Sequence, residues 1–189
     1  MPVLRSRYLD AGRLASARRS VRPKTPRTFA LRLKYALDRI AAVCAFALTL
    51  PLTAVVALAL VIRGGPVLAR ETQLGEAGRE IVVLTFAITV AMRRGRPWRA
   101  LDRAGVTFLP QLLNVVRGDL SLIGPRPRPR DHTPPPARPG LTGLAQVERL
   151  RRPITLADRL DLDAEYAQFW SLAADARIAA RTLLSFVKR

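Results

Sequence analysis

The sequence predicts an α/β chain that is anchored to a membrane by a helix near its N-terminus. Residues 40–62 carry no charged side chain. The run IVVLTFAITV at residues 81–90 is continuous and β-branched, which is typical of a strand buried on both faces. Apolar residues then recur at helical spacing over residues 154–188. These patterns divide the chain into a basic tail at 1–30, a membrane helix at 31–63 and a domain at 64–189.

The charge-free run is long enough to enter a bilayer deeply. As a helix it would reach about 35 Å, enough to cross the hydrocarbon core. Pro51 lies near its middle and removes one backbone donor, so we expect a bend there. A straight span would place one of its two basic flanks on the outer face, against the positive-inside rule. We therefore favour a re-entrant helix whose ends share one face, with a spanning helix as the alternative. The flanking cations are Arg32, Lys34, Arg39, Arg63, Arg70 and Arg79.

The charge of the chain points to an anionic partner. The net charge is +18, from 32 basic and 14 acidic residues. Arginines of the tail at 1–30 could bind anionic membrane lipids. We expect no nucleic-acid partner, because no nucleic-acid-binding motif accompanies the charge and a long apolar run suits such a protein poorly. The sole histidine, His132, lies in a Pro-rich stretch without a nearby cysteine, which argues against a zinc site.

The most informative stretch is Pro110 to Pro127, PQLLNVVRGDLSLIGPRP. Its first part has apolar residues at helical spacing, and Gly118 is expected to end that helix in a left-handed cap. Residues 119–123 alternate like a short strand. The loop that follows is stiffened by two prolines and would hold Arg126 outward, as recognition of a phosphate requires. The alternative is a helix cap followed by a solvated Pro/Arg loop.

The same stretch carries a family resemblance. NVVRGDLSLIGPRP resembles the signature of the bacterial sugar transferases, the monotopic polyprenyl-phosphate phosphoglycosyl transferases. ARPGLTGLAQVE, at residues 137–148, is similar to the Pro-Gly-Ile-Thr-Gly-Leu-Ala-Gln element of that family. Residues 64–89 are similar to a third family segment, with Gly65, Pro66 and Arg70 among the matches. The resemblance extends over about residues 31–189.

The resemblance implies a small α/β domain on the cytoplasmic face of the cell membrane, held by a re-entrant helix and interfacial helices. It also implies transfer of a sugar-1-phosphate from a UDP-sugar to polyprenyl phosphate, with Mg²⁺, in exopolysaccharide or glycoconjugate synthesis. Mg²⁺ is expected here only if activity is retained. The residues that we expect to bind a phosphate or nucleotide are Arg126, Arg117, Arg70, Arg103 and Gln146.

The chain departs from the family at the catalytic pair. Where the family reads Leu-Asp-Glu-Leu-Pro-Gln, this sequence reads VTFLPQ, so Thr107 and Phe108 replace the nucleophilic Asp and its acidic neighbour. A threonine hydroxyl is a weak nucleophile without a base, and no nearby base is expected. Phe108 can neither hold a metal ion nor move a proton. Thr85 and Ala87 also replace two family cations expected beside the phosphates. These changes predict a catalytically degenerate member.

Three function classes remain open. The first is a member that binds a UDP-sugar or polyprenyl phosphate without catalysis, or that pairs with an active sugar transferase. The second is an active phosphoglycosyl transferase with a relocated carboxylate, Asp102 or Asp119. Asp102 lies more than one helical turn before Thr107, which argues against a simple replacement. The third is a basic protein that binds the membrane surface, for which charge is the only support.

Overall fold

The computed structural model describes residues 28–88, 96–151 and 153–187 and confirms an α/β fold. Most of the predicted basic tail at 1–30 lies outside the described residues. The α-helices are α2 (Thr28–Ile62), α4 (Arg96–Arg103), α5 (Gln111–Arg117), α6 (Leu144–Arg151), α7 (Leu156–Phe169) and α8 (Leu172–Val187). The strands are β1 (Leu68–Leu74), β2 (Glu80–Phe86), β3 (Ser121–Ile123) and β4 (Gly140–Thr142), and the short 3-10 helices are η1 (Glu76–Gly78) and η2 (Val106–Phe108).

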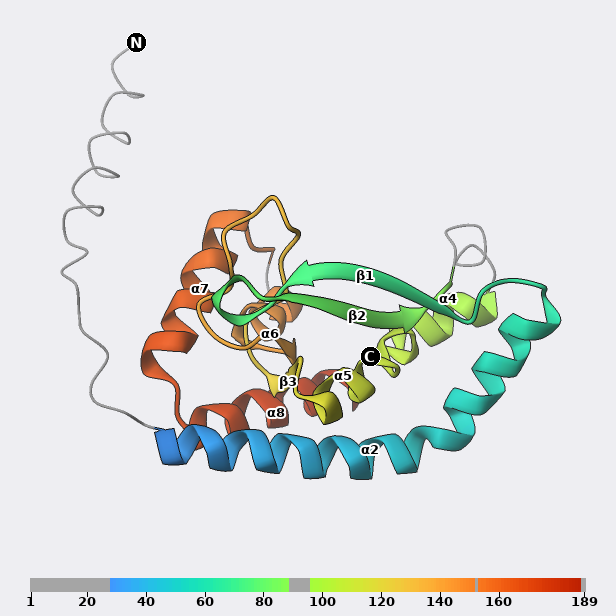
Figure 1. Cartoon of the computed structure of the whole chain (residues 1–189), viewed down its shortest axis with the longest axis horizontal. Coiled ribbons are helices and arrows are strands. Elements are labelled where there is room, and N and C mark those ends of the chain that lie inside the picture. The colour runs from blue at the N-terminus through green and yellow to red at the C-terminus, as the bar shows by residue number, and fades with distance from the viewer. Residues whose placement is uncertain (1–27, 89–95, 152, 188–189) are drawn as a thin grey trace, which may run out of the picture.

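Helix α2 bends at the predicted proline. Pro51 lies inside the helix, and Figure 1 shows a first arm along the base of the molecule and a second arm that turns toward the other elements. Two threonine hydroxyls lie beside the bend. That of Thr49 donates to the carbonyl of Ala45 (2.8 Å), and that of Thr53 donates to the carbonyl of Thr49 (2.9 Å). Within the described residues, α2 is the one helix long and apolar enough to cross a membrane.

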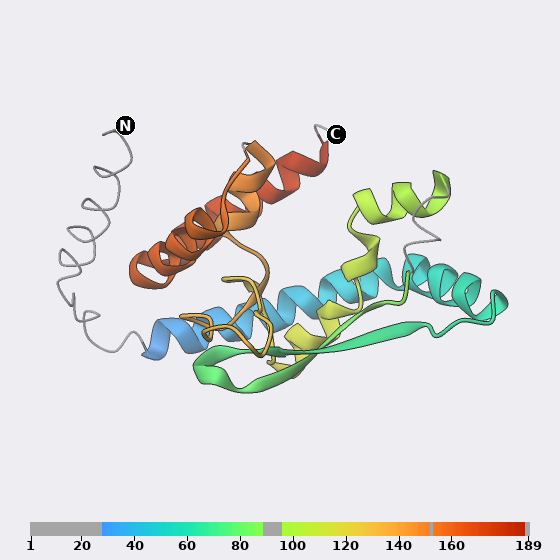
Figure 2. The same ribbon diagram turned by 90° about the horizontal axis from the view of Figure 1, so that it is seen from above.

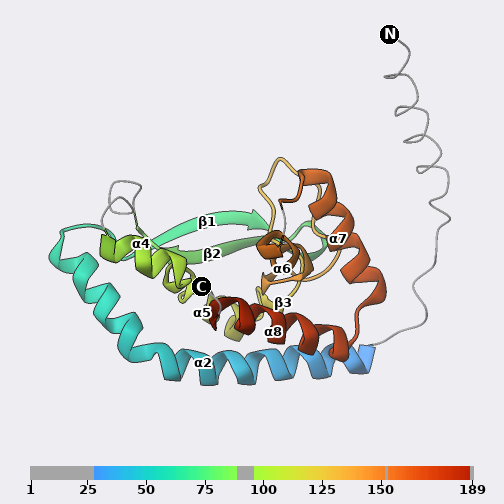
Figure 3. The ribbon, with the colours of Figure 1, turned by 180° about the vertical axis from the view of Figure 1, so that it is seen from behind.

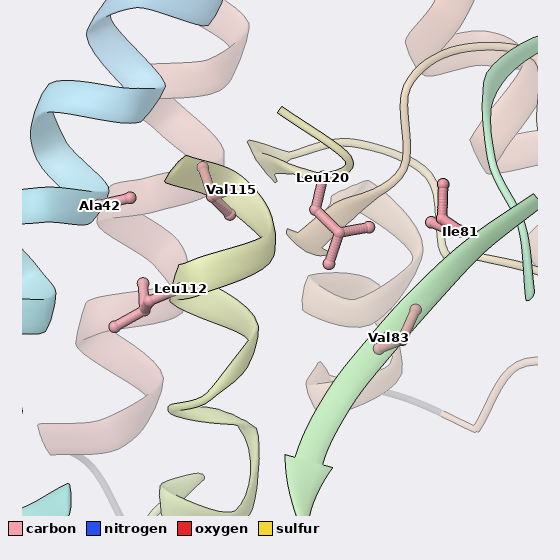
Figure 4. Packing of buried hydrophobic residues seen from close by; sticks show 6 residues of the cluster. All are labelled: Ala42, Ile81, Val83, Leu112, Val115 and Leu120. Carbon is pink, nitrogen blue, oxygen red and sulfur yellow. The ribbon is translucent and has the colours of Figure 1, made fainter. Parts of the chain in front are cut away.

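The main core lies between α2, α5 and hairpin β1–β2. Its buried side chains come from all three layers, with α5 in the middle, as Figure 4 shows. The helical period predicted for α5 is confirmed, and Gly118 ends the helix with φ 86°, a left-handed value that a residue with a Cβ adopts at a cost. The cluster comprises Ala42, Ile81, Val83, Leu112, Val115 and Leu120.

The two sheets are small. β1 and β2 form an antiparallel hairpin in which Leu68 pairs with Phe86 and Leu74 with Glu80, and β3 pairs with β4 in parallel. The prediction that β2 is buried on both faces is wrong for its first half, because Val82 is 45% exposed. Among the described strands β2 pairs with β1 alone, and it packs one face against α5, so the opposite face stays open there. Ile81, Val83, Leu84 and Phe86 are buried.

Two further clusters attach the remaining elements. Trp98 of α4 is buried with Val56 and Leu60 from the second arm of α2, so it is a core residue. Tyr166 and Trp170 pack with Ile178 around the end of β3. Figure 2 shows hairpin β1–β2 along one flank of α2 and helices α7 and α8 along the other. Seen from behind in Figure 3, α8 lies over the first arm of α2.

Candidate phosphate-binding site

Close contact between two loops builds the site. The backbone N–H of Gly124 donates to the carbonyl of Thr142 (2.9 Å), and that of Gly140 donates to the carbonyl of Pro125 (2.9 Å). A Cβ on Gly143 would lie 2.1 Å from the carbonyl oxygen of Gly124, so only glycine fits there. The parallel pair β3–β4 therefore holds the Gly-Pro-Arg-Pro loop against the start of α6.

A cavity of about 630 Å³ lies beside these loops. Arg126 projects from the loop after β3, and Gln146 lies in the first turn of α6. Asp102 and Phe108 approach from α4 and η2, so the position at which the resemblance expects the catalytic pair borders the same cavity. Apolar lining comes from Leu141, Ala145, Leu156 and Leu160, and the remaining polar lining from Arg128, His132, Arg149, Arg159, Thr142, Asp163, Thr182 and Ser185.

Several predicted site residues lie elsewhere. Arg117 is exposed at the end of α5 and Arg70 is exposed on β1, and neither lines the cavity. Asp119 pairs with Arg79, with 2.5 Å between Oδ1 and Nη2, also away from the cavity. Arg103 lies in α4, but its side chain falls outside the described part of the structure.

The replaced family cations are also not at the cavity. Thr85 lies near the end of β2 and Ala87 just beyond it, and both are half-buried away from the lining. Neither residue lines this cavity, so their place beside the phosphates stays a prediction. The departure that does reach it is the replacement of the acidic pair.

Sequence reasoning missed three of the four arginines at the cavity. Arg128 follows Arg126 in the Pro-rich loop, whereas Arg149 and Arg159 come from α6 and α7. Arg128 could have been predicted, because it repeats the Pro-Arg pair of Arg126 in the run PRPR. Arg149 and Arg159 belong to no motif, and the packing of α6 against α7 brings them to the site.

The arginines influence one another. Loss of hydration and the positive charges of Arg149 and Arg159 lower the pKa of Arg126 from its ordinary value. Each guanidinium nevertheless keeps its charge at neutral pH. Three like charges that converge on one cavity favour occupation by an anion.

Two polar atoms at the cavity lack a partner within the described residues. They are Arg159 Nε, a donor, and Gln146 Oε1, an acceptor, and both atoms are buried. Arg128 Nη2, by contrast, donates to Asp163 Oδ2 at 3.3 Å, and this pair is largely buried. Burial raises the pKa of Asp163, and the hydrogen bond from Arg128 opposes that rise. Asp163 is therefore paired with Arg128, while the Nε–H of Arg159 still has no acceptor within the described residues.

Thr107, the position at which the resemblance expects the nucleophile, has a neighbour that the sequence did not predict. Thr107 is 2% exposed, and its hydroxyl donates to Asp102 Oδ1 at 2.9 Å. The expectation that no base lies near Thr107 is thus wrong, as is the argument that places Asp102 too far away. Gly105, with φ 77°, turns the chain back between α4 and η2 and closes the distance. Phe108 is 47% exposed and presents its ring to the cavity.

These side chains do not match a family-type Mg²⁺ site. Mg²⁺ prefers carboxylate oxygens in octahedral geometry. Where the resemblance expects the acidic pair, the aromatic ring of Phe108 offers no oxygen ligand, and Asp102 Oδ1 already accepts a hydrogen bond from the Thr107 hydroxyl. Asp163, the other acidic residue of the lining, is held by Arg128. We therefore derive no step through a metal ion.

The chain is similar in sequence to known proteins over the segments that form these loops. The bacterial sugar transferase family model matches residues 29–189. The chain is 37% identical over 185 residues to the UDP-glucose:undecaprenyl-phosphate glucose-1-phosphate transferase of Caulobacter vibrioides, covering 82% of this chain and 69% of that protein. It is 32% identical to the exopolysaccharide production protein PSS of Rhizobium leguminosarum bv. phaseoli, covering 84% of this chain and 97% of the relative.

A longer relative matches over its shared part only. The UDP-glucose:undecaprenyl-phosphate glucose-1-phosphate transferase of Escherichia coli is 29% identical, and the match covers 80% of this chain but 39% of that protein. The family match nevertheless includes α2, the loops of the cavity and all three C-terminal helices. The chain belongs to the bacterial sugar transferase family.

Proposed function

We propose that this protein binds the phosphates of a UDP-sugar or of polyprenyl phosphate at the cytoplasmic face of the cell membrane, and that it no longer transfers a phosphosugar through the family's acidic pair. One observation supports this most strongly. Within the described residues the cavity beside the family loops is lined by four arginines, while Thr107 and Phe108 stand where the resemblance expects the catalytic carboxylates. Relatives named for UDP-glucose and undecaprenyl phosphate indicate the ligand class and a role in exopolysaccharide synthesis.

The proposed membrane location rests on α2. Its apolar side chains are largely exposed, for example Leu48 at 83% and Val55 at 64%. Exposed apolar surface of this extent suits contact with lipid. The bend at Pro51 returns the second arm toward the rest of the molecule (Figure 1), which supports a monotopic, re-entrant anchor. Basic residues at both ends would contact anionic lipids on one face.

The proposed loss of transfer rests on Thr107. A covalent mechanism needs a nucleophile that reaches the phosphorus atom of the substrate. The Thr107 hydroxyl is buried and already donates to Asp102, and Phe108 supplies no proton-transfer group. A catalytically inactive family member of this kind would act by binding the ligand or by pairing with an active sugar transferase, its proposed protein partner.

Titration with UDP tests the binding proposal. Arg126→Ala should weaken UDP binding by about 1.5–3 kcal/mol, or roughly tenfold or more, because a charge-assisted hydrogen bond is lost. Arg117→Ala is the matched control, since Arg117 is exposed outside the cavity. Equal affinities of wild type and Arg126→Ala would contradict the assignment of Arg126 to the phosphates, and no binding of UDP to wild type would contradict a UDP-sugar as the ligand.

A second candidate function is an active transferase that uses Asp102. Its carboxylate lies at the cavity and touches the very residue that replaces the family nucleophile. Asp119 loses its standing as an alternative, because it pairs with Arg79 outside the cavity. Release of UMP from a UDP-sugar separates the two functions, since binding alone leaves the UDP-sugar intact.

A further inference from the structure

We propose that the arginines of this cavity bind a diphosphate directly and that binding needs no divalent metal ion. The inference rests on the proposed function and makes it more specific. In place of a metal ion held by paired carboxylates, the site would use guanidinium groups from three separate elements. The predicted ligand is a nucleoside diphosphate or another diphosphate ester.

Three separate elements bring guanidinium groups to the cavity. Arg126 is fixed on the loop after β3, Arg149 lies on α6 and Arg159 lies on α7. Guanidinium groups offer paired N–H donors in a planar fork that matches phosphate oxygens. Arg159 Nε is buried and has no hydrogen-bond partner within the described residues, so one donor awaits an acceptor.

The charged side chains that line the cavity are mostly positive. The acidic side chains of the lining are Asp102 and Asp163, against four arginines. Asp163 is 5% exposed and is held by Arg128, so this pair adds little net charge to the cavity. Three arginines then face the single carboxylate of Asp102. A dication placed among them would be repelled, whereas the two phosphates of UDP would be attracted.

Phe108 stands where the resemblance expects a carboxylate, and this difference also favours an anion over a metal ion. Phe108 contributes an exposed ring to the lining, and a carboxylate there would both attract Mg²⁺ and repel phosphate. The aromatic residue removes both effects at once. The same change that removes the family's metal ligand therefore strengthens direct binding of an anion by Arg126, Arg149 and Arg159.

The test is a UDP titration of the purified full chain in detergent, by calorimetry, once with EDTA and once with excess Mg²⁺. We expect UDP to bind in EDTA at least as tightly as in Mg²⁺. Arg159→Gln should weaken binding in EDTA by roughly tenfold or more. Arg177→Gln, exposed on α8 outside the cavity, is the matched control and should bind like wild type.

The outcomes separate the two proposals. UDP binding that appears only with Mg²⁺ would overturn the metal-free inference while supporting the proposed binding function. Absence of UDP binding in both buffers would overturn the UDP-sugar as the ligand of the proposed function, and the metal-free inference with it. Unchanged affinity of Arg159→Gln in EDTA would overturn the assignment of the arginines as the diphosphate ligands.

A second pair of variants tests the role of charge at Phe108. Phe108→Glu should weaken UDP binding in EDTA by about tenfold and make binding tighter when Mg²⁺ is added. Phe108→Gln has nearly the same shape as Phe108→Glu without the charge, so it should bind UDP in EDTA more tightly than Phe108→Glu and gain nothing from added Mg²⁺. Equal weakening by the Gln and Glu variants would contradict the charge argument, because lost packing would then explain the change.

Discussion

Asp175 is the centre of a buried polar cluster that joins α2 to α8. Lys34 Nζ lies 2.8 Å from Asp175 Oδ2 and 3.0 Å from Asp38 Oδ2. The indole N–H of Trp170 donates to Asp175 (2.9 Å), and the hydroxyl of Tyr166 lies 2.8 Å from its Oδ1. Burial and the negative charge of Asp175 raise the pKa of Tyr166 far above its ordinary value, so the phenol keeps its proton and donates.

We expect Tyr166→Phe to lower the free energy of unfolding by about 1–3 kcal/mol, because a buried carboxylate loses a donor. Denaturant unfolding in detergent, followed by tryptophan fluorescence, measures this change. Phe169→Leu is the control, since Phe169 is 67% exposed on the same helix and its replacement should change stability by less than about 0.5 kcal/mol. Equal stability of Tyr166→Phe and wild type would contradict a structural role for this hydrogen bond.

Asp163 should make stability depend on pH. Because burial raises its pKa in the folded protein, its contribution to stability is fully present below its unfolded pKa, about 3.9, and declines as the pH rises through the folded value. We expect wild type to lose stability relative to Asp163→Asn as the pH increases above about 4. Unfolding of both proteins across this range measures the difference. A stability difference that grows in favour of wild type with rising pH would contradict the sign.

At this scale the sequence predicted Asp102 as a candidate carboxylate, and the other cavity residues that it predicted lie in segments that resemble the family. Arg126 and Gln146 were predicted because both lie in segments that resemble the family. Arg149 and Arg159 were not, because their meeting depends on how α6 packs against α7. The contact between Asp102 and Thr107 depends on the positive φ of Gly105, which a spacing of five residues does not reveal.

Among the elements, α2 was the most predictable. Its charge-free run and Pro51 indicated a long bent helix, and the structure confirms both features. The hairpin was less predictable. A β-branched run indicates burial but not how many strands flank it, and with β1 as the one neighbour in its sheet the face bearing Val82 stays exposed.

The re-entrant topology makes a prediction about accessibility. In a Cys44→Ser background, single cysteines at positions 30 and 66 should react with a membrane-impermeant maleimide only after the cells are permeabilised, because both ends of α2 would face the cytoplasm. Pro51→Ala should restore the missing backbone donor and shift part of the protein toward a spanning helix. Leu52→Ala, which keeps the proline, is the control. Labelling of one position in intact wild-type cells would reject the re-entrant anchor.

Across the whole molecule, three hydrophobic clusters connect the anchor to the cavity. One cluster joins the first arm of α2 to α5 and β2, and another joins the second arm to α4 and η2. The third joins the end of β3 to α6, α7 and α8. The loop bearing Arg126 follows β3 directly, so the membrane helix and the arginine cavity belong to one packed unit (Figure 1). This arrangement supports ligand capture at the membrane surface.

The central claim is that this unit retains binding of phosphates but no longer transfers a phosphosugar. Its most direct test is UMP release from UDP-glucose by membranes that contain the protein and undecaprenyl phosphate, with Mg²⁺ present. Membranes without the protein give the background, and Asp102→Asn is the matched variant. We predict no UMP above background for wild type. Robust Mg²⁺-dependent release of UMP that Asp102→Asn abolishes would contradict the claim and identify Asp102 as the relocated catalytic carboxylate.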